Sequence, residues 1–210
     1  MTGKDDLDRA LDDLPADLRW REWLRRVEAV LFASAVPVAR DALARVVGQG
    51  VSVDLLISDL AADLATRPYE VVQVAGGWML RTKPAYAEAI RVAAVVAGQG
   101  LALSAADLGV LAAIAYHQPI SRDGLRGLFG GEVSREVILR LSGVDLITTG
   151  PREPRRGAPH TYVTTPAFLV AFGLNTLRDL ADPEHLADAG LHSPEGDPKH
   201  SPESGGPSQP

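Results

Sequence analysis

Apolar residues in the first part of the chain recur at intervals of three and four residues, the spacing of one face of a helix. Trp23 opens this stripe and Phe32 shares its spacing, so both aromatic rings are expected in the core. Pro37 ends the helix, because proline removes a backbone donor and clashes with the preceding turn. The stripe comprises Trp23, Leu24, Val27, Val30 and Leu31.

Two further helices are expected before the apolar period changes. Residues 38–47 form the first, and Gly48 ends it because glycine readily adopts the left-handed conformation found after helices. Ser52 can cap the second with its hydroxyl. The apolar stripe of this second helix consists of Leu55, Leu56, Leu60 and Leu64.

The period of two that is typical of strands then appears. Residues 72–74 and 78–80 alternate apolar and polar side chains, and the pair Gly76-Gly77 lies between them. This pattern predicts a β-hairpin. A helix is expected after Pro84. Its buried side is expected to hold Tyr86, Ile90 and Val96.

Three helices are expected again after residue 103. Ser104 and Asp107 have the spacing of a capping box, in which each side chain accepts a hydrogen bond from the other residue's backbone. Pro119 ends the helix that this box begins. Ser121 and Ser134 can cap the next two helices, so the pattern of the first part is repeated.

Two strands and a last helix complete the second part. Residues 144–147 and 162–163 are the expected strands, joined by a long loop. Thr165-Pro166 begins the last helix, since proline is favoured at the first helical position. Phe168 and Phe172 lie four residues apart on this helix, and both are expected in the core.

Three helices followed by a hairpin is the order of elements in a winged helix, a relative of the helix-turn-helix. The sequence therefore predicts a mainly α structure with small β-hairpins (α+β), folded as two tandem winged-helix domains. Residues 23–98 and 99–181 are the expected domains. Residues 1–22 form an acidic N-terminal extension, with a frayed amphipathic helix. Residues 182–210 are rich in Pro, Gly and Ser, which predicts a disordered acidic tail.

The net charge of −6 is concentrated at the two ends. Residues 1–22 carry 7 acidic and 4 basic side chains, and residues 181–210 carry 6 acidic and 1 basic. The remainder is almost neutral, which disfavours a protein that binds nucleic acid by its charge. The chain has no cysteine, no signal-peptide pattern and no long apolar run. We therefore expect a cytoplasmic protein, without a membrane segment.

The sequence contains no constellation that is typical of an enzyme. His117 and His160 have no partner at the spacing of metal ligands, and the other three histidines fall in the expected tail. The Gly-Gln-Gly segments at 48–50 and 98–100 lack the lysine and hydroxyl residue of a phosphate-binding loop. We expect no catalytic residue, no cofactor and no metal.

Direct DNA binding is the alternative function, since winged-helix proteins often place their third helix in the major groove. Here the third helix of the first domain carries Asp54, Asp59 and Asp63, which would repel phosphate. The wing of the second domain has Arg152, Arg155 and Arg156, and could touch DNA. A solvated loop is the favoured interpretation of that wing, and a transcriptional regulator remains the alternative function.

Two long motifs resemble the bacterial segregation and condensation protein B (ScpB) family. Ile-Ala-Tyr-His-Gln-Pro-Ile-Ser-Arg at 114–122 is similar to its signature turn, and residues 161–180 are similar to its strand and closing helix. The resemblance covers residues 23–180 in outline. The residues that carry the signature, and that are candidates for partner binding, are Tyr116, Gln118, Pro119, Arg122, Tyr162, Thr164, Thr165 and Phe168.

The resemblance implies a non-enzymatic adaptor of the bacterial SMC-kleisin condensin complex. Such a protein forms a homodimer through its first domain and binds the kleisin (ScpA-like) subunit, and through it the SMC ATPase, with its second. It takes part in chromosome condensation and segregation, and associates with the nucleoid through the complex. The chain departs from the family pattern at Gly109, where an acidic residue is expected, and at Phe129, where arginine is expected.

Two signature residues keep alternative roles. Arg122 lies just inside a short helix, where a positive charge is disfavoured by the helix dipole. It therefore either pairs with a carboxylate within its domain or contacts the partner. Tyr116 either packs in the core or presents its hydroxyl at an interface, because tyrosine combines an apolar ring with a polar end.

Overall fold

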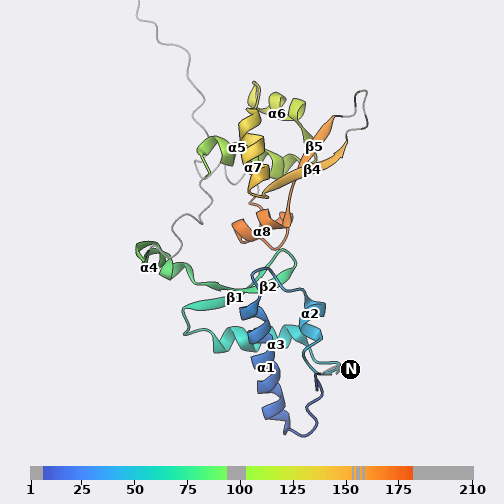
Figure 1. The fold of residues 1–210 in the computed structure, drawn as a ribbon, viewed down its shortest axis with the longest axis vertical. Helices are drawn as coiled ribbons and strands as arrows, with labels where there is room; N and C mark the ends of the chain where they lie inside the picture. The colour runs from blue at the N-terminus through green and yellow to red at the C-terminus, as the bar shows by residue number, and fades with distance from the viewer. Residues whose placement is uncertain (1–6, 94–102, 153, 155–156, 158, 182–210) are drawn as a thin grey trace, which may run out of the picture. The chain divides into compact units, whose positions relative to one another are not determined.

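The computed structural model describes residues 7–93, 103–152, 154, 157 and 159–181. Within these residues, eight α-helices and two small antiparallel sheets form a mixed α and β structure (Figure 1). The expected linker around residues 98–100 and the expected tail at 182–210 lie outside the described residues.

The first region contains three helices and a hairpin. They are α1 (Ala16–Ala33), α2 (Arg40–Ala44), α3 (Val53–Asp63), β1 (Tyr69–Val74) and β2 (Gly77–Thr82). The strands pair in antiparallel register, with Val72 opposite Met79. Ala75 and Gly76 both have positive φ angles, 50° and 76°, as a two-residue hairpin turn requires. At Gly77 a side chain would lie 2.8 Å from the Val38 carbonyl oxygen, so this position needs glycine.

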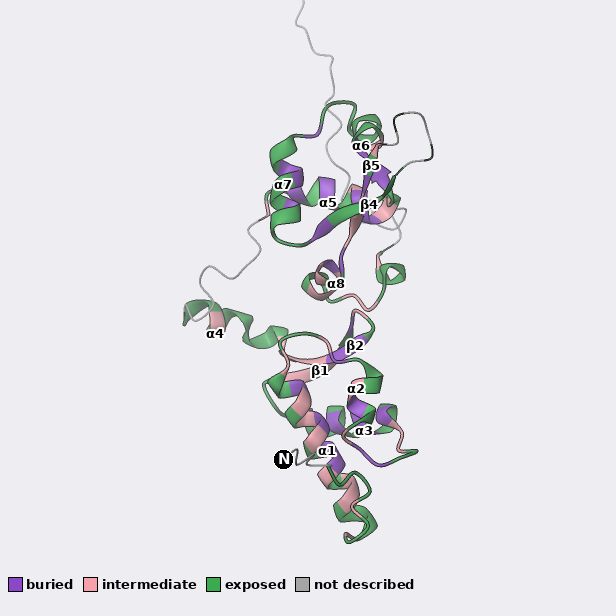
Figure 2. Cartoon of the chain, turned by 45° about the vertical axis from the view of Figure 1, so that its right-hand side comes forward, coloured by how far each residue is buried: buried purple, intermediate pink, exposed green. Residues whose placement is uncertain are grey.

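The core of the first region lies where α1 and α3 face each other (Figure 2). Trp23 and Trp78 are each only 9% exposed, as expected for Trp23. Phe32 was expected in the core, but its side chain is 82% exposed. The reason is the helical rotation of about 100° per residue, which turns Phe32 away when Leu31 points inward. Residues with 0% exposure include Val27, Leu43 and Leu56.

Most of the predicted stripe of α3 is confirmed, since Leu56, Leu60 and Leu64 are each at most 4% exposed. Ser52 caps this helix as expected, and its hydroxyl accepts from the backbone of Leu55 at 3.4 Å. Leu55 itself is 59% exposed, so its expected place in the buried stripe was wrong. It is turned about 100° away from Leu56 by the helical rotation. The buried face within the helix comprises Val53, Leu56, Ile57 and Leu60.

Helix α1 begins at Ala16, within the segment expected to be an N-terminal extension. The residues before it pack on the helix. The Trp23 indole donates to the Arg9 carbonyl at 2.9 Å, and Arg26 donates to the Asp8 carbonyl at 2.7 Å. Arg19 pairs with Asp12 at 3.2 Å. Residues 8–12 are therefore held on one face of α1 by the side chains of Arg19 and Arg26.

The segment after the hairpin is helical but exposed. A 3₁₀ turn at Pro84–Tyr86 leads into α4 (Ala87–Val92), and none of its residues is buried. Tyr86 is 44% exposed, which corrects the expectation that it lies on a buried side. Ile90 is half-buried, and Val96 lies outside the described residues.

The second region repeats this order of elements, with an extra strand. Its helices are α5 (Ala105–His117), α6 (Arg122–Phe129), α7 (Arg135–Gly143) and α8 (Pro166–Phe172). Its strands are β3 (Ile120–Ser121), β4 (Ile147–Arg152) and β5 (His160–Thr164), in the order β3–β5–β4. The three expected serine caps are confirmed, since the hydroxyl groups of Ser104, Ser121 and Ser134 each accept a bond from the first turn. The Thr165 hydroxyl caps α8 in the same way, which was not predicted.

Three expectations for this region need correction. Strand β4 begins at Ile147 rather than at residue 144, because Asp145 turns the chain with a φ angle of 57°. Strand β3 was not expected, since a strand of two residues has no readable period. Phe172 is 45% exposed, whereas Phe168 is buried at 3% as expected.

Among the described residues, no helix is long and apolar enough to cross a membrane.

Candidate functional site

The two signature motifs meet in the sheet of the second region. The end of α5 continues into β3, where Ile120 lies opposite Tyr162 of β5 and Ser121 lies opposite Thr161. The peptide bond between Gln118 and Pro119 is cis. Segments that are about forty residues apart in the sequence are therefore neighbours. All eight signature residues belong to the motif at 114–122 or to the motif at 161–180.

Gln118 connects the two motifs with its side chain. Its amide nitrogen donates to the Ala115 carbonyl at 3.2 Å, which satisfies an acceptor left open at the end of α5. Its amide oxygen accepts from the backbone nitrogen of Thr164 at 2.7 Å and from the Thr164 hydroxyl at 3.1 Å. These bonds join the end of α5 to the end of β5, a connection that the sequence did not predict.

Thr165 holds the start of the closing helix. Its hydroxyl accepts from the backbone nitrogen of Phe168 at 3.3 Å and donates to the carbonyl of Asp145. The backbone of Thr165 also donates to Leu146 at 3.2 Å. The Phe168 ring is buried and lies 4.9 Å from the ring of Phe172, between ring centres. Thr165 and Phe168 thus position α8.

Arg122 reaches a neighbouring turn rather than the sheet. Its guanidinium donates to the Val133 carbonyl at 2.9 Å and lies 4.0 Å from the Glu132 carboxylate. The principal partner is a backbone oxygen, and the carboxylate that the sequence suggested is only at the limit of an ion pair. Because 43% of the Arg122 side chain is exposed, part of it is accessible to another molecule.

The three remaining signature residues flank this connection. Tyr116 is half-buried near the end of α5, and Tyr162 is half-buried in β5. Pro119 is exposed in the turn between α5 and β3. Of the eight candidates, Pro119 and Arg122 are therefore exposed, and Tyr116 and Tyr162 each keep part of their surface accessible.

A second polar connection joins α5 and α7, and the sequence predicted only part of it. Asp107 belongs to the expected capping box, but its carboxylate also accepts two-pronged bonds from Arg140, at 2.8 Å and 3.1 Å. The Asp107 side chain is 2% exposed. The Arg140 guanidinium, followed by the bonds from Ser104, holds the pKa of Asp107 well below its usual range. The same carboxylate raises the pKa of Arg140.

This arrangement is a hydrogen-bonded framework. In the part of the chain that the structure describes, no buried side-chain nitrogen or oxygen lacks a hydrogen-bond partner. Over the same residues, no group of three or more histidine or acidic side chains is placed to hold a metal ion. The bonds of Gln118, Thr165 and Asp107 fix neighbouring elements to one another, so the framework can shape a contact surface.

Apolar side chains lie on the surface of the neighbouring helices. Leu108 of α5 is 44% exposed, and Leu128 and Phe129 of α6 are 50% and 47% exposed. A side chain added at Gly109 would lie 3.9 Å from the Phe129 ring, so the two helices meet at this point. We call Leu108, Leu128 and Phe129 the α5–α6 patch. Such a patch is typical of a surface that contacts another protein.

Comparison with known proteins gives consistent matches over most of the chain. The family model described as "Segregation and condensation complex subunit ScpB" matches residues 25–183. "Segregation and condensation protein B" of Moorella thermoacetica is 35% identical over 164 residues, which are 77% of this chain and 83% of that protein. The protein of the same name from Desulforamulus reducens is 36% identical over 157 residues, covering 73% and 85%.

Solved structures were also matched. The crystal structure of ScpB from Mycobacterium tuberculosis has 28% identity and a TM-score of 0.34, over 74% of this chain and 97% of that one. A conserved hypothetical protein from Chlorobium tepidum has 29% identity and a TM-score of 0.35, over 75% and 99%.

Proposed function

The chain belongs to the family of segregation and condensation complex subunit ScpB, and on this premise we propose that it is a non-enzymatic adaptor of the bacterial SMC-kleisin condensin complex. The observation that carries the proposal is the family match over residues 25–183. In this role the protein binds the kleisin subunit, and through it the SMC ATPase, and takes part in chromosome condensation and segregation. It acts in the cytoplasm, at the nucleoid, and needs no cofactor.

Each region is proposed to be a winged-helix module. The support is the repeated order of three helices and an antiparallel strand pair, α1 to β2 and α5 to β5. Winged-helix modules often bind proteins as well as nucleic acids, so the fold alone does not select a partner.

The second module, residues 99–181, is proposed to hold the kleisin. Its support is the α5–α6 patch together with the exposed part of Arg122, which lie on the helices around the signature turn. Interfaces combine buried apolar and aromatic anchors with arginine. The signature residues Gln118, Thr164 and Thr165 contribute indirectly in this proposal, because their bonds fix the turn that presents this surface.

The first module, residues 23–98, is proposed to form the homodimer. Trp23 and Trp78 are buried in the core, so neither is available to an interface. The support comes from exposed apolar and aromatic residues of this region: Phe32 is 82% exposed, Val36 66%, Val92 74% and Tyr86 44%. Exposed apolar and aromatic residues at this density favour an interface between proteins.

The carboxylates of α3 disfavour the alternative of a DNA-binding regulator. Asp54 pairs with Arg40, and Asp59 accepts from the Trp20 indole at 2.8 Å. Both carboxylates are thus fixed on the helix that would have to enter the major groove. Arg40 offsets the charge of Asp54, but Asp59 keeps its negative charge on this helix, which disfavours contact with the phosphate backbone.

Co-purification tests the proposal. The full chain, carrying an affinity tag, is co-expressed with the kleisin and SMC subunits of the same organism. We expect the kleisin to be retained, and the SMC subunit to be retained only when the kleisin is present. In parallel, the full chain is titrated against duplex DNA at low and moderate salt. Failure to retain the kleisin, together with tight DNA binding that weakens steeply with salt, would support the regulator instead.

A further inference from the structure

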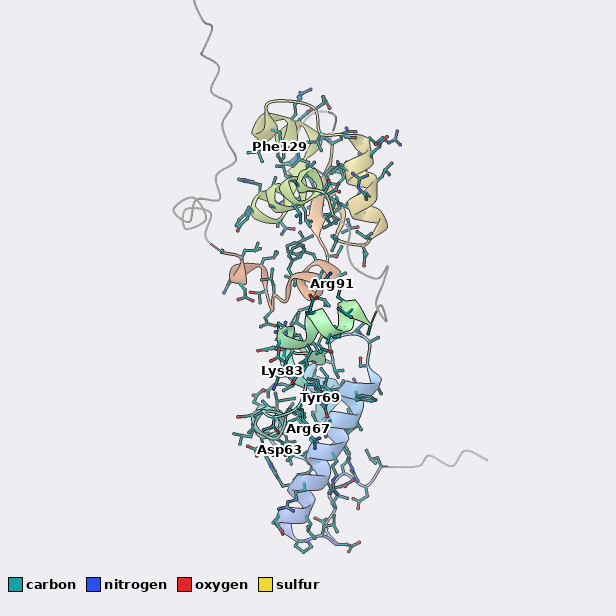
Figure 3. The ribbon with its side chains drawn as sticks, turned by 90° about the vertical axis from the view of Figure 1, so that its left-hand side faces the viewer. Asp63, Arg67, Tyr69, Lys83, Arg91 and Phe129 are labelled. Atoms are coloured by element: carbon teal, nitrogen blue, oxygen red, sulfur yellow. The ribbon has the colours of Figure 1, made fainter. Side chains whose placement is uncertain are left out.

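A cavity of about 480 Å³ lies between α1 and the end of α3, and nothing in the proposed function uses it. Leu24, Leu60 and Leu64, each at most 9% exposed, form its floor. Its rim is charged, with Arg21 and Arg25 on α1 and Arg67 after α3. Figure 3 labels Asp63, Arg67 and Tyr69, which follow one another along this rim. We call this cavity the α1–α3 groove.

Two guanidinium groups of the groove are not engaged. Within the described residues, the side chains of Arg21 and Arg67 make no hydrogen bond or ion pair, whereas the Arg25 guanidinium lies 3.8 Å from Glu22. The Glu28 carboxylate on the rim accepts from the Tyr69 hydroxyl at 3.4 Å. The groove therefore presents two available cations above an apolar floor.

The volume and the chemistry of the groove fit a peptide. Cavities of this size hold several side chains, and arginine binds carboxylates through two parallel hydrogen bonds. The leucine floor accepts an apolar side chain. Asp63 is also on the rim without an ion pair among the residues described, so a phosphate-rich ligand such as nucleic acid would be repelled there. A peptide can instead place a donor against Asp63.

The protein already uses arginines of α1 in this way on another face. Arg19 and Arg26 hold the acidic residues 8–12 against the helix, by an ion pair to Asp12 and a bond to the Asp8 carbonyl. Arg21 and Arg25 are displaced from that face by the helical rotation. We propose that the α1–α3 groove binds an acidic peptide segment of a partner protein, with carboxylates on Arg21 and Arg67 and an apolar side chain on the leucine floor.

Fluorescence polarisation tests the site with a defined probe, a fluorescein-labelled peptide of alternating Glu and Leu, about twelve residues long. The full chain is expected to bind it at low salt, and the same peptide with Gln for Glu only weakly. The double variant Arg21→Ala/Arg67→Ala should bind the acidic probe roughly tenfold more weakly. Its Tm should not change, because both side chains are exposed. Arg45→Ala is the matched control, because Arg45 is an exposed arginine at the end of α2.

A gain of binding provides a second readout that misfolding would not give. Asp63→Asn removes one of the two carboxylates of the rim, so it should tighten binding of the acidic probe severalfold. No binding by the unmodified chain, equal binding by the double variant, or equal binding of the Gln peptide would overturn the proposal.

Two other occupants are excluded or identified by the same assay. If a chain ending at Ala181 binds the probe roughly tenfold more tightly than the full chain, the chain's own acidic end occupies the groove. If the double variant changes the sedimentation of the protein from dimer to monomer, a second copy occupies it. Either result would mean that this protein itself occupies the groove, and would overturn the proposal of a partner segment. Because the assay contains no kleisin, its failure leaves the adaptor proposal untouched.

Discussion

The two regions follow the same order of helices and strands but are stabilised differently. In residues 16–93, α1 and α2 begin without a side-chain cap, and the core is a cluster of leucine, valine and tryptophan side chains. In residues 104–179, hydroxyl side chains cap all of α5 to α8, and Gln118 and Asp107 bond across elements. Apolar packing specifies the first region, whereas polar connections specify much of the second.

The difference explains where a family resemblance can be read. Apolar packing accepts many side chains of similar volume, so the pattern of the first region is shared by unrelated helical proteins. A hydrogen bond between Gln118 and Thr164 needs an amide at one position and a donor at the other. The second region therefore carries the longer and more specific motif.

The largest expected effect comes from the apolar core of the first region. Leu56 is 0% exposed, so Leu56→Ala should lower the free energy of unfolding by about 2–5 kcal/mol through lost burial and a cavity. Its neighbour Leu55 is 59% exposed, and Leu55→Ala should change the free energy of unfolding by about 0.5 kcal/mol or less. Urea denaturation of both variants measures this difference. Equal losses would mean that the register of α3 is wrong.

The Asp107–Arg140 pair should make the stability of the second region depend on pH. The pKa of Asp107 in the folded chain lies below its ordinary value of 3.8. A lowered pKa adds stability that is present above pH 3.8 and is lost as the pH falls towards the folded value. At pH 7, Asp107→Asn should therefore lower Tm, and the difference from the unmodified chain should shrink as the pH decreases below 4.

Asp123→Asn is the control for this experiment. Asp123 forms an exposed ion pair with Arg126 at 3.2 Å, and exposed pairs contribute little to stability. Its Tm should stay close to that of the unmodified chain over the whole pH range. If the difference in Tm between Asp107→Asn and the unmodified chain becomes larger as the pH falls, the pKa of Asp107 is not lowered in the folded chain.

The substitution Gln118→Ala should weaken the connection between the two signature motifs. Gln118→Ala removes three hydrogen bonds, each worth about 0.5–1.5 kcal/mol, so a loss of about 1–3 kcal/mol is expected. Gln49→Ala, in an exposed turn of the first region, should have almost no effect. Differential scanning calorimetry compares the two variants. An unchanged Tm for Gln118→Ala would show that β3 and β5 pair without its help.

The smallest stability effect is expected at Arg122. Arg122→Ala removes one bond to the Val133 carbonyl from a side chain that is 43% exposed, a loss of about 1 kcal/mol. We expect stability and kleisin affinity to fall together, because the bond fixes the surface that the partner contacts. Arg126→Ala, at an exposed ion pair on the same helix, is the matched control.

Thermal unfolding and calorimetric binding separate the possible roles of Arg122. Reduced affinity with unchanged stability would mean that Arg122 touches the partner directly. No change in either measurement would remove Arg122 from both the framework and the interface.

Element order and helix caps were predictable from the sequence because they depend on local spacing. Ser104 with Asp107 and Ser121 are examples, since a cap lies within three residues of the groups it satisfies. Details set by rotation or by distant partners were not predictable. Phe32 and Leu55 are each one residue from a buried leucine, and the rotation of about 100° per residue turns them outward. The pair between Asp107 and Arg140 joins positions 33 residues apart.

For the candidate site, the sequence supplied candidate residues but not the contacts they make. The motifs gave Gln118, Thr164 and Thr165, whereas only the structure joins them through β3 and β5. The α5–α6 patch had no signal in the sequence beyond the departures at Gly109 and Phe129, since an exposed apolar residue on a helix has the same letter as a buried one.

The central claim is that the second region binds the kleisin subunit. Isothermal titration of the full chain with the kleisin of the same organism tests it most directly, using the variant Leu108→Asp/Phe129→Asp and, as control, Leu139→Asp at a 58% exposed position of α7. The account predicts saturable binding by the unmodified chain and the control, and a loss of roughly tenfold or more in affinity for the double variant with an unchanged Tm. Absence of binding by the unmodified chain, or equal binding by the double variant, would contradict it.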